Sequence, residues 1–223
     1  MGSFEGMYEL RMSRALDAER RCYAPAGWLY PHGVALHLPL GPLDETLHTL
    51  APGRALVGLL RHPVQRLLSA FHHGMHAPGM PRERHARLRQ QCRGDAACFA
   101  RFPGVAGCQA KMLLGHACGE DVPLPGDSIQ QAVQRLREWF AFVGVAECFT
   151  ASVCAFHRQL GGAPAEVERQ HVRQGVRRVQ PVAGGGRGED FRYDEAQLGG
   201  FVDEADEAVY AEAKRLLAQA ADM

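Results

Sequence analysis

Residues 56–71 read LVGLLRHPVQRLLSAF, and this stretch decides the fold. Its first part belongs to an apolar run at 54–60, whose length and composition predict a buried β-strand. Pro63 suits the first position of a helix, where no intrahelical amide bond is lost and the ring presets the backbone angle. Apolar residues then recur at helical spacing as far as Met75, so the stretch predicts a strand, a short turn and a helix.

The rest of the chain continues this alternation of apolar runs and amphipathic stretches. Further strands are predicted at 33–39 and 139–145. Helices are predicted at 5–19, 42–50, 82–92, 106–115, 127–138 with Asp127 or Ser128 as N-cap, 147–160 and 194–220. Strands separated by helices are typical of parallel sheets. The sequence therefore predicts an α/β fold, a small parallel sheet flanked by helices, in which helix predominates.

The size and composition of the chain favour one globular domain. It has 223 residues, of which 46% are hydrophobic and 22% charged. Its 25 basic residues equal its 25 acidic ones, so the overall basic field expected of a nucleic-acid-binding protein is absent. No window approaches eighteen uninterrupted apolar residues, and the first residues carry charges, so neither a membrane span nor a signal peptide is predicted in the chain as given.

Charge is nevertheless distributed unevenly along the chain. Residues 54–101 hold nine Arg against two carboxylates, whereas residues 189–212 hold nine carboxylates against one Arg. Only Lys111 and Lys214 are lysines, so nearly all the cations are guanidinium groups. An Arg-rich middle suits the bidentate binding of anions, but a GC-rich coding sequence gives the same excess of Arg.

The seven cysteines include a local group of four at 92, 98, 108 and 118. None of the seven is spaced C-x-x-C, so a zinc ribbon or a thioredoxin-type redox site is not indicated. The group of four suits disulfides in an oxidising compartment, for example Cys92 with Cys98 and Cys108 with Cys118, although four cysteines allow three pairings. Small buried thiols are the alternative.

Arg61 and Ser69 are the residues that this fold places best for binding an anion. Arg61 follows the strand at the carboxyl edge of the sheet, which is where α/β folds bind ligands. The helix opened by Pro63 offers amide groups and a dipole that favour phosphate, and Ser69 lies two turns along it. From spacing alone, a surface arginine and a small packing residue are the alternative.

Several blocks of the chain resemble one enzyme family. LLRHPVQRLLSAF resembles the 3′-phosphate-binding motif of the membrane-type carbohydrate sulfotransferases, which use PAPS (3′-phosphoadenosine-5′-phosphosulfate). GCQAKMLLG at 107–115, FAFVGVAECFTASVCAFHRQLG at 140–161 and YDEAQLGGFVDEADEAVYAEAKRLL at 193–217 are similar to later blocks of that family, in the same order. The resemblance runs from about residue 33 to the end of the chain.

The resemblance implies a P-loop-like sulfotransferase fold, sulfuryl transfer from PAPS to a carbohydrate hydroxyl, and no metal. It implies that Arg61 and Ser69 hold the nucleotide 3′-phosphate. It also implies that His37, in the string HLPLG, is the catalytic base, as in the branch that sulfates the 2-hydroxyl group. An imidazole titrates near neutral pH and can take the proton of the attacking hydroxyl, although a structural histidine is the alternative. A Golgi-lumenal site, a glycan acceptor and an amino-terminal membrane anchor, which this chain lacks, are implied in the same way.

The chain departs from the family at its beginning. Such enzymes have an amino-terminal glycine- and Ser/Thr-rich loop with a cation that cradles the 5′-phosphosulfate. Residues 1–32 contain no Lys and no such loop. We therefore expect a single domain, in which 1–32 is a remnant of the first unit and 33–223 the family-like region. The chain as written is expected to be either a truncated sequence or a variant that does not transfer sulfate. A non-catalytic protein that binds glycan, or the bare product nucleotide PAP (adenosine 3′,5′-bisphosphate), is the alternative function.

Four further groups suggest chemistry less specifically. His72 and His76 have the spacing of a metal-binding pair but no third ligand is evident, so no metal is predicted. Four arginines at 82, 84, 87 and 89 could contact a sulfated or uronic acid glycan or form a solvated helix face. Three others, at 173, 177 and 178, could fold over a nucleotide or belong to a surface loop, and Trp28 could stack on a sugar or lie in the core.

Overall fold

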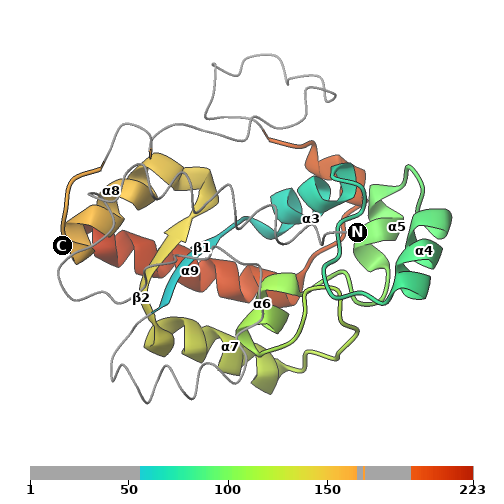
Figure 1. The fold of residues 1–223 in the computed structure, drawn as a ribbon, viewed down its shortest axis with the longest axis horizontal. Helices are drawn as coiled ribbons and strands as arrows, with labels where there is room; N and C mark the ends of the chain where they lie inside the picture. The colour runs from blue at the N-terminus through green and yellow to red at the C-terminus, as the bar shows by residue number, and fades with distance from the viewer. Residues whose placement is uncertain (1–55, 165–167, 169–191, 223) are drawn as a thin grey trace, which may run out of the picture.

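Two short parallel strands lie in the middle of the fold (Figure 1). The computed structural model of the chain describes residues 56–164, 168 and 192–222. Within this part, β1 (Leu56–Leu60) pairs with β2 (Phe140–Val145), and Leu60 is the register partner of Val145. Both strands therefore end at the same edge of the sheet.

Helices make up most of the described chain. They are α3 (Pro63–His72), α4 (Arg82–Gln91), α5 (Ala96–Arg101), α6 (Cys108–Leu113), α7 (Gly126–Trp139), α8 (Phe149–Leu160) and α9 (Glu204–Asp222), with 3-10 turns η1 (Ala146–Cys148) and η3 (Glu195–Leu198). In Figure 1, α7 and α8 lie on either side of the strands and α9 runs across them, and all three contact β2. The helix-rich α/β class predicted from the sequence is confirmed at this level.

The apolar residues form two adjacent cores. The first surrounds β2, which is buried along almost its whole length, and includes residues of α7, α8 and α9 such as Leu136, Ala155 and Val209. The second lies between α3, α4 and α5 and is centred on Leu67, Leu88 and Phe99. Helix α3 leads from the sheet into the second core, so it connects the two.

β1 is covered less completely than β2 by the residues that the structure describes. Val57 and Leu59 on one face of the strand are 49% and 54% exposed. On the other face, Gly58 lies against the ring of Phe140, where an added Cβ would be 2.8 Å from a ring carbon. A larger residue at position 58 would therefore require the Phe140 ring to move.

The predicted strands at 54–60 and 139–145 correspond to β1 and β2, and the predicted helices in the described part correspond to α3, α4, α6, α7 and α8. Helix α5 was not predicted. Asp95 is its N-cap, and the Asp95 carboxylate accepts a hydrogen bond from the Cys98 amide at 2.9 Å. Helix α7 begins after Pro125, so Asp127 lies in its first turn and neither Asp127 nor Ser128 is its N-cap. The elements predicted at 5–19, 33–39 and 42–50, and the proposed remnant at 1–32, lie outside the described residues.

The prediction of one helix over 194–220 is wrong at its start. A short 3-10 turn ends at Leu198, and Gly199 and Gly200 follow with φ angles of +56° and +72°. This left-handed conformation suits glycine and ends the turn. The long helix begins only after Asp203, whose side-chain oxygen accepts from the Asp206 amide at 3.3 Å, as an N-cap does.

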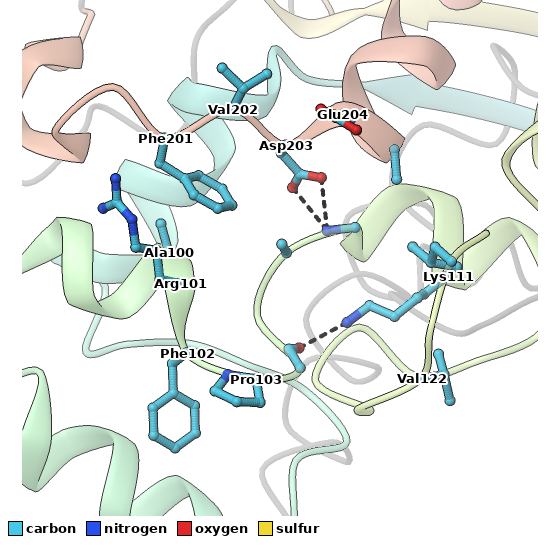
Figure 2. A pocket seen from close by; sticks show the side chains of 15 residues that line it. Ala100, Arg101, Phe102, Pro103, Lys111, Val122, Phe201, Val202, Asp203 and Glu204 are labelled. Carbon is cyan, nitrogen blue, oxygen red and sulfur yellow. Dashed lines mark hydrogen bonds between the residues drawn. The ribbon is translucent and has the colours of Figure 1, made fainter. Parts of the chain in front are cut away.

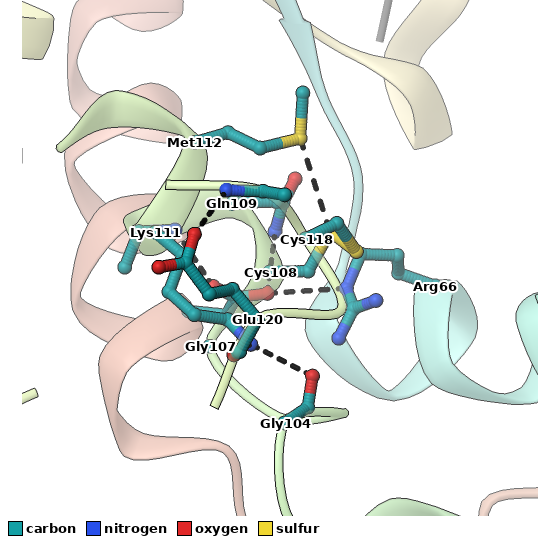
Figure 3. Close-up of a disulfide and its surroundings, with 12 residues drawn as sticks. Arg66, Gly104, Gly107, Cys108, Gln109, Lys111, Met112, Cys118 and Glu120 are labelled. Carbon is teal, nitrogen blue, oxygen red and sulfur yellow. Dashed lines mark hydrogen bonds and ion pairs between the residues drawn. A yellow bond between two sulfur atoms is a disulfide. The ribbon is translucent and has the colours of Figure 1, made fainter. Parts of the chain in front are cut away.

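Two disulfides are present in the described residues, and their pairing is the one that the sequence analysis gives as an example. Cys92–Cys98 joins the end of α4 to α5, and Cys108–Cys118 joins the start of α6 to the loop that follows it (Figure 3). Cys148 and Cys154 carry free thiols. No helix in the described part of the chain is both long and apolar enough to cross a membrane.

Glu212 of α9 is the centre of an ion cluster that joins α9 to α7. Its side chain is 6% exposed and accepts from Arg137 Nε at 2.7 Å and from Arg215 Nε at 3.1 Å. The hydrogen bond from Arg137 is the main reason that the pKa of Glu212 is lowered to about 2, with Arg215 acting in the same direction. A carboxylate whose pKa is lower in the folded state stabilises that state above its unfolded pKa, about 4.3, and loses this effect as the pH falls toward 2.

We therefore expect the replacement Glu212→Gln to reduce the free energy of unfolding at pH 7 and to matter less and less between about pH 4.3 and pH 2. Urea unfolding of both proteins across this range measures the difference. Glu138→Gln, at an exposed carboxylate of α7, is the control for loss of one negative charge. A difference between wild type and Glu212→Gln that stays constant with pH would contradict the assignment.

Candidate functional site

Arg61 leaves the sheet at the edge where both strands end. Gln109 of α6 holds its backbone on both sides: the Arg61 amide donates to Gln109 Oε1 at 2.9 Å, and Gln109 Nε2 donates to the Arg61 carbonyl at 3.0 Å. The side-chain amide thus makes the two hydrogen bonds that a neighbouring strand would otherwise make. The backbone of the candidate anion-binding residue is therefore held in one position.

Glu147, which follows β2, lies beside Arg61 at the same edge. Its two carboxylate oxygens accept from the His62 amide at 3.0 and 3.1 Å, and Tyr210 of α9 donates its hydroxyl to one of them at 3.1 Å. Burial, together with the negative charge of Glu147, raises the pKa of Tyr210. The His62 amide, just before α3, is therefore occupied by a carboxylate of the chain and is not available to a phosphate.

The guanidinium of Arg61 is only partly committed to Glu147. Its Nε lies 3.8 Å from Glu147 Oε1, and the side chain is 36% exposed. Burial lowers the pKa of Arg61, while Glu147 opposes this effect. No hydrogen bond joins the Arg61 guanidinium to any residue that the structure describes, so its remaining N–H groups can serve a ligand.

Ser69 lies on α3, one turn after Gln65 and on the same side of the helix. It is half-buried, and its hydroxyl makes no hydrogen bond within the described residues. Arg61 and Ser69 thus belong to one strand–helix unit, as the sequence predicts. His37 lies outside the described residues, as do Trp28 and the arginines at 173, 177 and 178.

A buried pair of carboxylates fixes the helices behind this edge. Asp206 is fully buried and accepts from the Ala110 amide at 2.9 Å and from Arg66 Nε at 3.1 Å. Asp203 is 4% exposed and accepts from the Gly107 amide at 2.9 and 3.0 Å. The two carboxylates therefore cap the start of α6, and Arg66 of α3 balances their charge.

Lys111, one of the two lysines of the chain, is also buried. Its ammonium donates to the carbonyls of Gly104 at 2.8 Å and Glu120 at 2.9 Å (Figure 3). Burial lowers the pKa of Lys111 to about 8, and burial together with Asp206 raises that of Asp203 to about 6. Lys111 therefore holds two loops together.

A pocket of about 350 Å³ lies beside Asp203 (Figure 2). Phe201 and Val202 border it on one side, and Phe102 and Pro103 on the other. Arg61 does not line this pocket. The described structure therefore separates the candidate anion-binding arginine from this cavity.

The possible metal pair receives no support in the described part of the chain. His72 Nε2 lies 3.1 Å from Gln197 Oε1, and its ring stacks on Tyr193 at 5.0 Å. No group of three potential metal ligands occurs among the described residues. The ring of Trp139 packs against the first core and lies 4.8 Å from the guanidinium of Arg135.

Sequence reasoning missed the residues that hold Arg61 in place. Gln109, Glu147 and Tyr210 all lie inside the blocks quoted for the family resemblance, but no spacing rule assigned them a role. Their contacts join residues 48 to 85 positions apart, so periodicity could not reveal them. For Gln109 and Glu147, a polar residue beside apolar neighbours was the available signal.

Comparison with protein-family models, with curated proteins and with solved structures finds no match to this chain. What the chain does must therefore be argued from its own residues.

Asp206→Asn tests whether the carboxylate pair organises this region. The change keeps the size of the side chain but removes the charge that faces Arg66, leaving a mostly buried guanidinium with less compensation. We expect the free energy of unfolding, measured by urea titration at pH 7, to fall by about 3 kcal/mol. Glu204→Gln, at the exposed carboxylate two residues earlier, should cost less than about 1 kcal/mol. Equal losses in the two variants would show that the pair does not have this role.

Proposed function

We propose that this chain is a sulfotransferase-type protein with a P-loop-like fold that binds the 3′-phosphate end of PAPS and serves sulfuryl transfer to a carbohydrate hydroxyl. The observation that carries the proposal is the placement of Arg61. Its backbone is clamped by Gln109 at the carboxyl edge of a parallel sheet, and part of its guanidinium remains without a hydrogen-bond partner among the described residues. Parallel α/β sheets bind ligands at this edge, and a positioned guanidinium binds phosphate as a planar fork.

In this proposal Arg61 and Ser69 both donate to the 3′-phosphate. Glu147 offsets the positive charge of Arg61. The described residues would therefore attract a phosphate more through oriented hydrogen-bond donors than through net positive charge. Ser69 adds a hydroxyl on the helix that follows Arg61. A phosphate bound here would gain directed hydrogen bonds in a partly buried setting, where such bonds are stronger than in water.

The chemistry proposed for the reaction is a direct displacement at sulfur. The acceptor hydroxyl oxygen forms a bond to sulfur, the bond from sulfur to the bridging phosphate oxygen breaks, and PAP leaves. The hydroxyl proton passes to His37, which lies outside the described residues. Residues of the chain need only position the groups and stabilise charge, so no metal is required by this scheme.

The disulfides support a lumenal location of the Golgi type. Cys92–Cys98 and Cys108–Cys118 are formed in the described part of the chain. Structural disulfides persist in oxidising compartments and are rare in the cytosol. The proposed acceptors, glycans under assembly, are found in the same secretory compartments as such cross-links.

A protein that binds PAP without turnover is the second candidate, because the same half-site at Arg61 would serve it. Incubation with radiolabelled PAPS and a panel of glycans separates the two candidates. Transfer of label identifies an enzyme, and binding of PAP without transfer identifies the non-catalytic protein.

Arg61→Ala tests the nucleotide site shared by both candidates. We expect calorimetric titration to show PAP binding weakened by about 10- to 150-fold, because a charge-assisted hydrogen-bonding group is lost. Binding of 5′-AMP, which lacks the 3′-phosphate, should be nearly unchanged. Arg89→Ala, at an exposed arginine of α4, controls for the loss of one positive charge. Equal weakening of both nucleotides would refute the assignment of Arg61 to the 3′-phosphate.

A further inference from the structure

Lys111 is a buried cation to which the proposed function gives no role. Its side chain is only 1% exposed. The ammonium donates to the carbonyls of Gly104 and Glu120, and no ion pair joins it to a carboxylate among the described residues. Buried charges are normally paired, because an uncompensated charge is costly away from water. Burial at this position therefore favours any step that converts the ammonium into a neutral group.

The charges around Lys111 leave a usable share of it as neutral amine. Burial lowers the pKa of Lys111 to about 8, and Arg66 acts in the same direction. Three carboxylates oppose these effects, those of Asp206, Asp203 and Asp121. At pH 7 a lysine with this pKa is about one tenth amine, whereas at the ordinary pKa of about 10.4 the share is below about one thousandth. A lysine whose charge is disfavoured by burial is the kind that serves as a nucleophile.

The two hydrogen bonds of Lys111 leave one position of its nitrogen open. A neutral amine has two N–H groups and one lone pair, and the carbonyls of Gly104 and Glu120 can accept from both N–H groups. No described residue donates a hydrogen bond to the remaining position. Lys111 lines the pocket of about 350 Å³, and in Figure 2 its side chain extends from α6 toward the loop that carries Pro103. The lone pair is therefore available to a ligand in this pocket.

The walls of the pocket favour an uncharged ligand with an apolar body. Its volume is within the range of small-ligand sites, about 300 to 1,000 Å³. Most of the side chains that line it are apolar, including those of Phe102, Pro103, Val122, Leu124, Phe201 and Val202. Asp203 and Glu204 border the same pocket and would repel an anion, whereas Arg101 and Lys111 would repel a cation. A neutral electrophile meets neither difficulty.

We propose that Lys111 forms an imine with an aldehyde whose apolar body lies in this pocket. The amine lone pair attacks the aldehyde carbon, so that a C–N bond forms and the carbonyl oxygen becomes a hydroxyl group. Water then leaves, made of the aldehyde oxygen and the two amine hydrogens, and a C=N bond remains. If the imine is protonated, its N–H can still donate to one of the two carbonyls. The proposal does not rest on the proposed function, because neither Arg61 nor a nucleotide takes part.

The sequence makes a direct test possible, because Lys111 and Lys214 are its only lysines and Lys214 is exposed. The folded protein is incubated at pH 7 with benzaldehyde and sodium cyanoborohydride, which reduces an imine to a stable secondary amine. Peptide mass spectrometry then compares the two lysines. We expect Lys111 to be modified about tenfold faster than Lys214 or more, because a larger share of it is amine. Glyoxylate, an anionic aldehyde without an apolar body, should not show this preference, and unfolding in urea should abolish it.

Two matched variants test the role of the pocket. Phe201→Leu should slow the modification of Lys111 by benzaldehyde about 2- to 12-fold, because an aromatic contact is lost. Phe71→Leu, at another partly buried ring against the same second core, does not alter the pocket and should change the rate less than about twofold.

Modification of Lys111 no faster than that of Lys214 would overturn the proposal, since it would show that Lys111 only holds the two loops together. Equal effects of Phe201→Leu and Phe71→Leu would also overturn it, because the ligand would then not occupy the pocket. The comparison of the two lysines in the wild-type protein needs no variant, so it decides the matter even if a variant fails to fold.

Discussion

The structure depends on two buried carboxylates that lie three residues apart in the sequence. Asp203 and Asp206 repel one another, and burial makes their charged forms costly, so they persist only with strong compensation. That compensation comes from the amides of Gly107 and Ala110 and from the guanidinium of Arg66. Three helices distant in sequence, α3, α6 and α9, are fixed by these contacts. Gln109 lies between the two capped amides, so the position of Arg61 follows from the same arrangement.

This arrangement also explains much of the uneven charge along the chain. The basic middle and the acidic end meet inside the molecule, where Arg66 pairs with the carboxylates of Asp203 and Asp206. Arg101 likewise donates to the carbonyls of Leu198 and Gly199 in the acidic segment. A charge asymmetry that suggested an external anionic partner thus serves partly to hold the fold together. The arginines that remain available to ligands are fewer than the composition implies.

Sequence reasoning succeeded where a single local property determines the structure. Apolar runs followed by Pro63, or preceding Glu147, were sufficient to place β1 and β2. It failed where the local geometry of a few residues determines an element. Helix α5 has six residues, too few to show a periodic pattern, and the start of α9 depends on Gly199 and Gly200. The placement of Arg61 at the sheet edge was predictable, because the end of an apolar strand can be recognised in a sequence. The residues that hold Arg61 in place were not predictable, because Gln109 and Glu147 are far from it in the sequence.

The Cys108–Cys118 cross-link has a consequence for how this region opens. It closes a loop around Lys111, and the ammonium of Lys111 binds one carbonyl before the loop, that of Gly104, and one after it, that of Glu120. Amide hydrogens on both sides should therefore exchange with solvent in a single cooperative opening rather than by separate fraying. A protease cut between residues 109 and 117 would leave both fragments covalently joined. After such a cut, the piece that carries Gln109 would therefore stay attached to the rest of the fold.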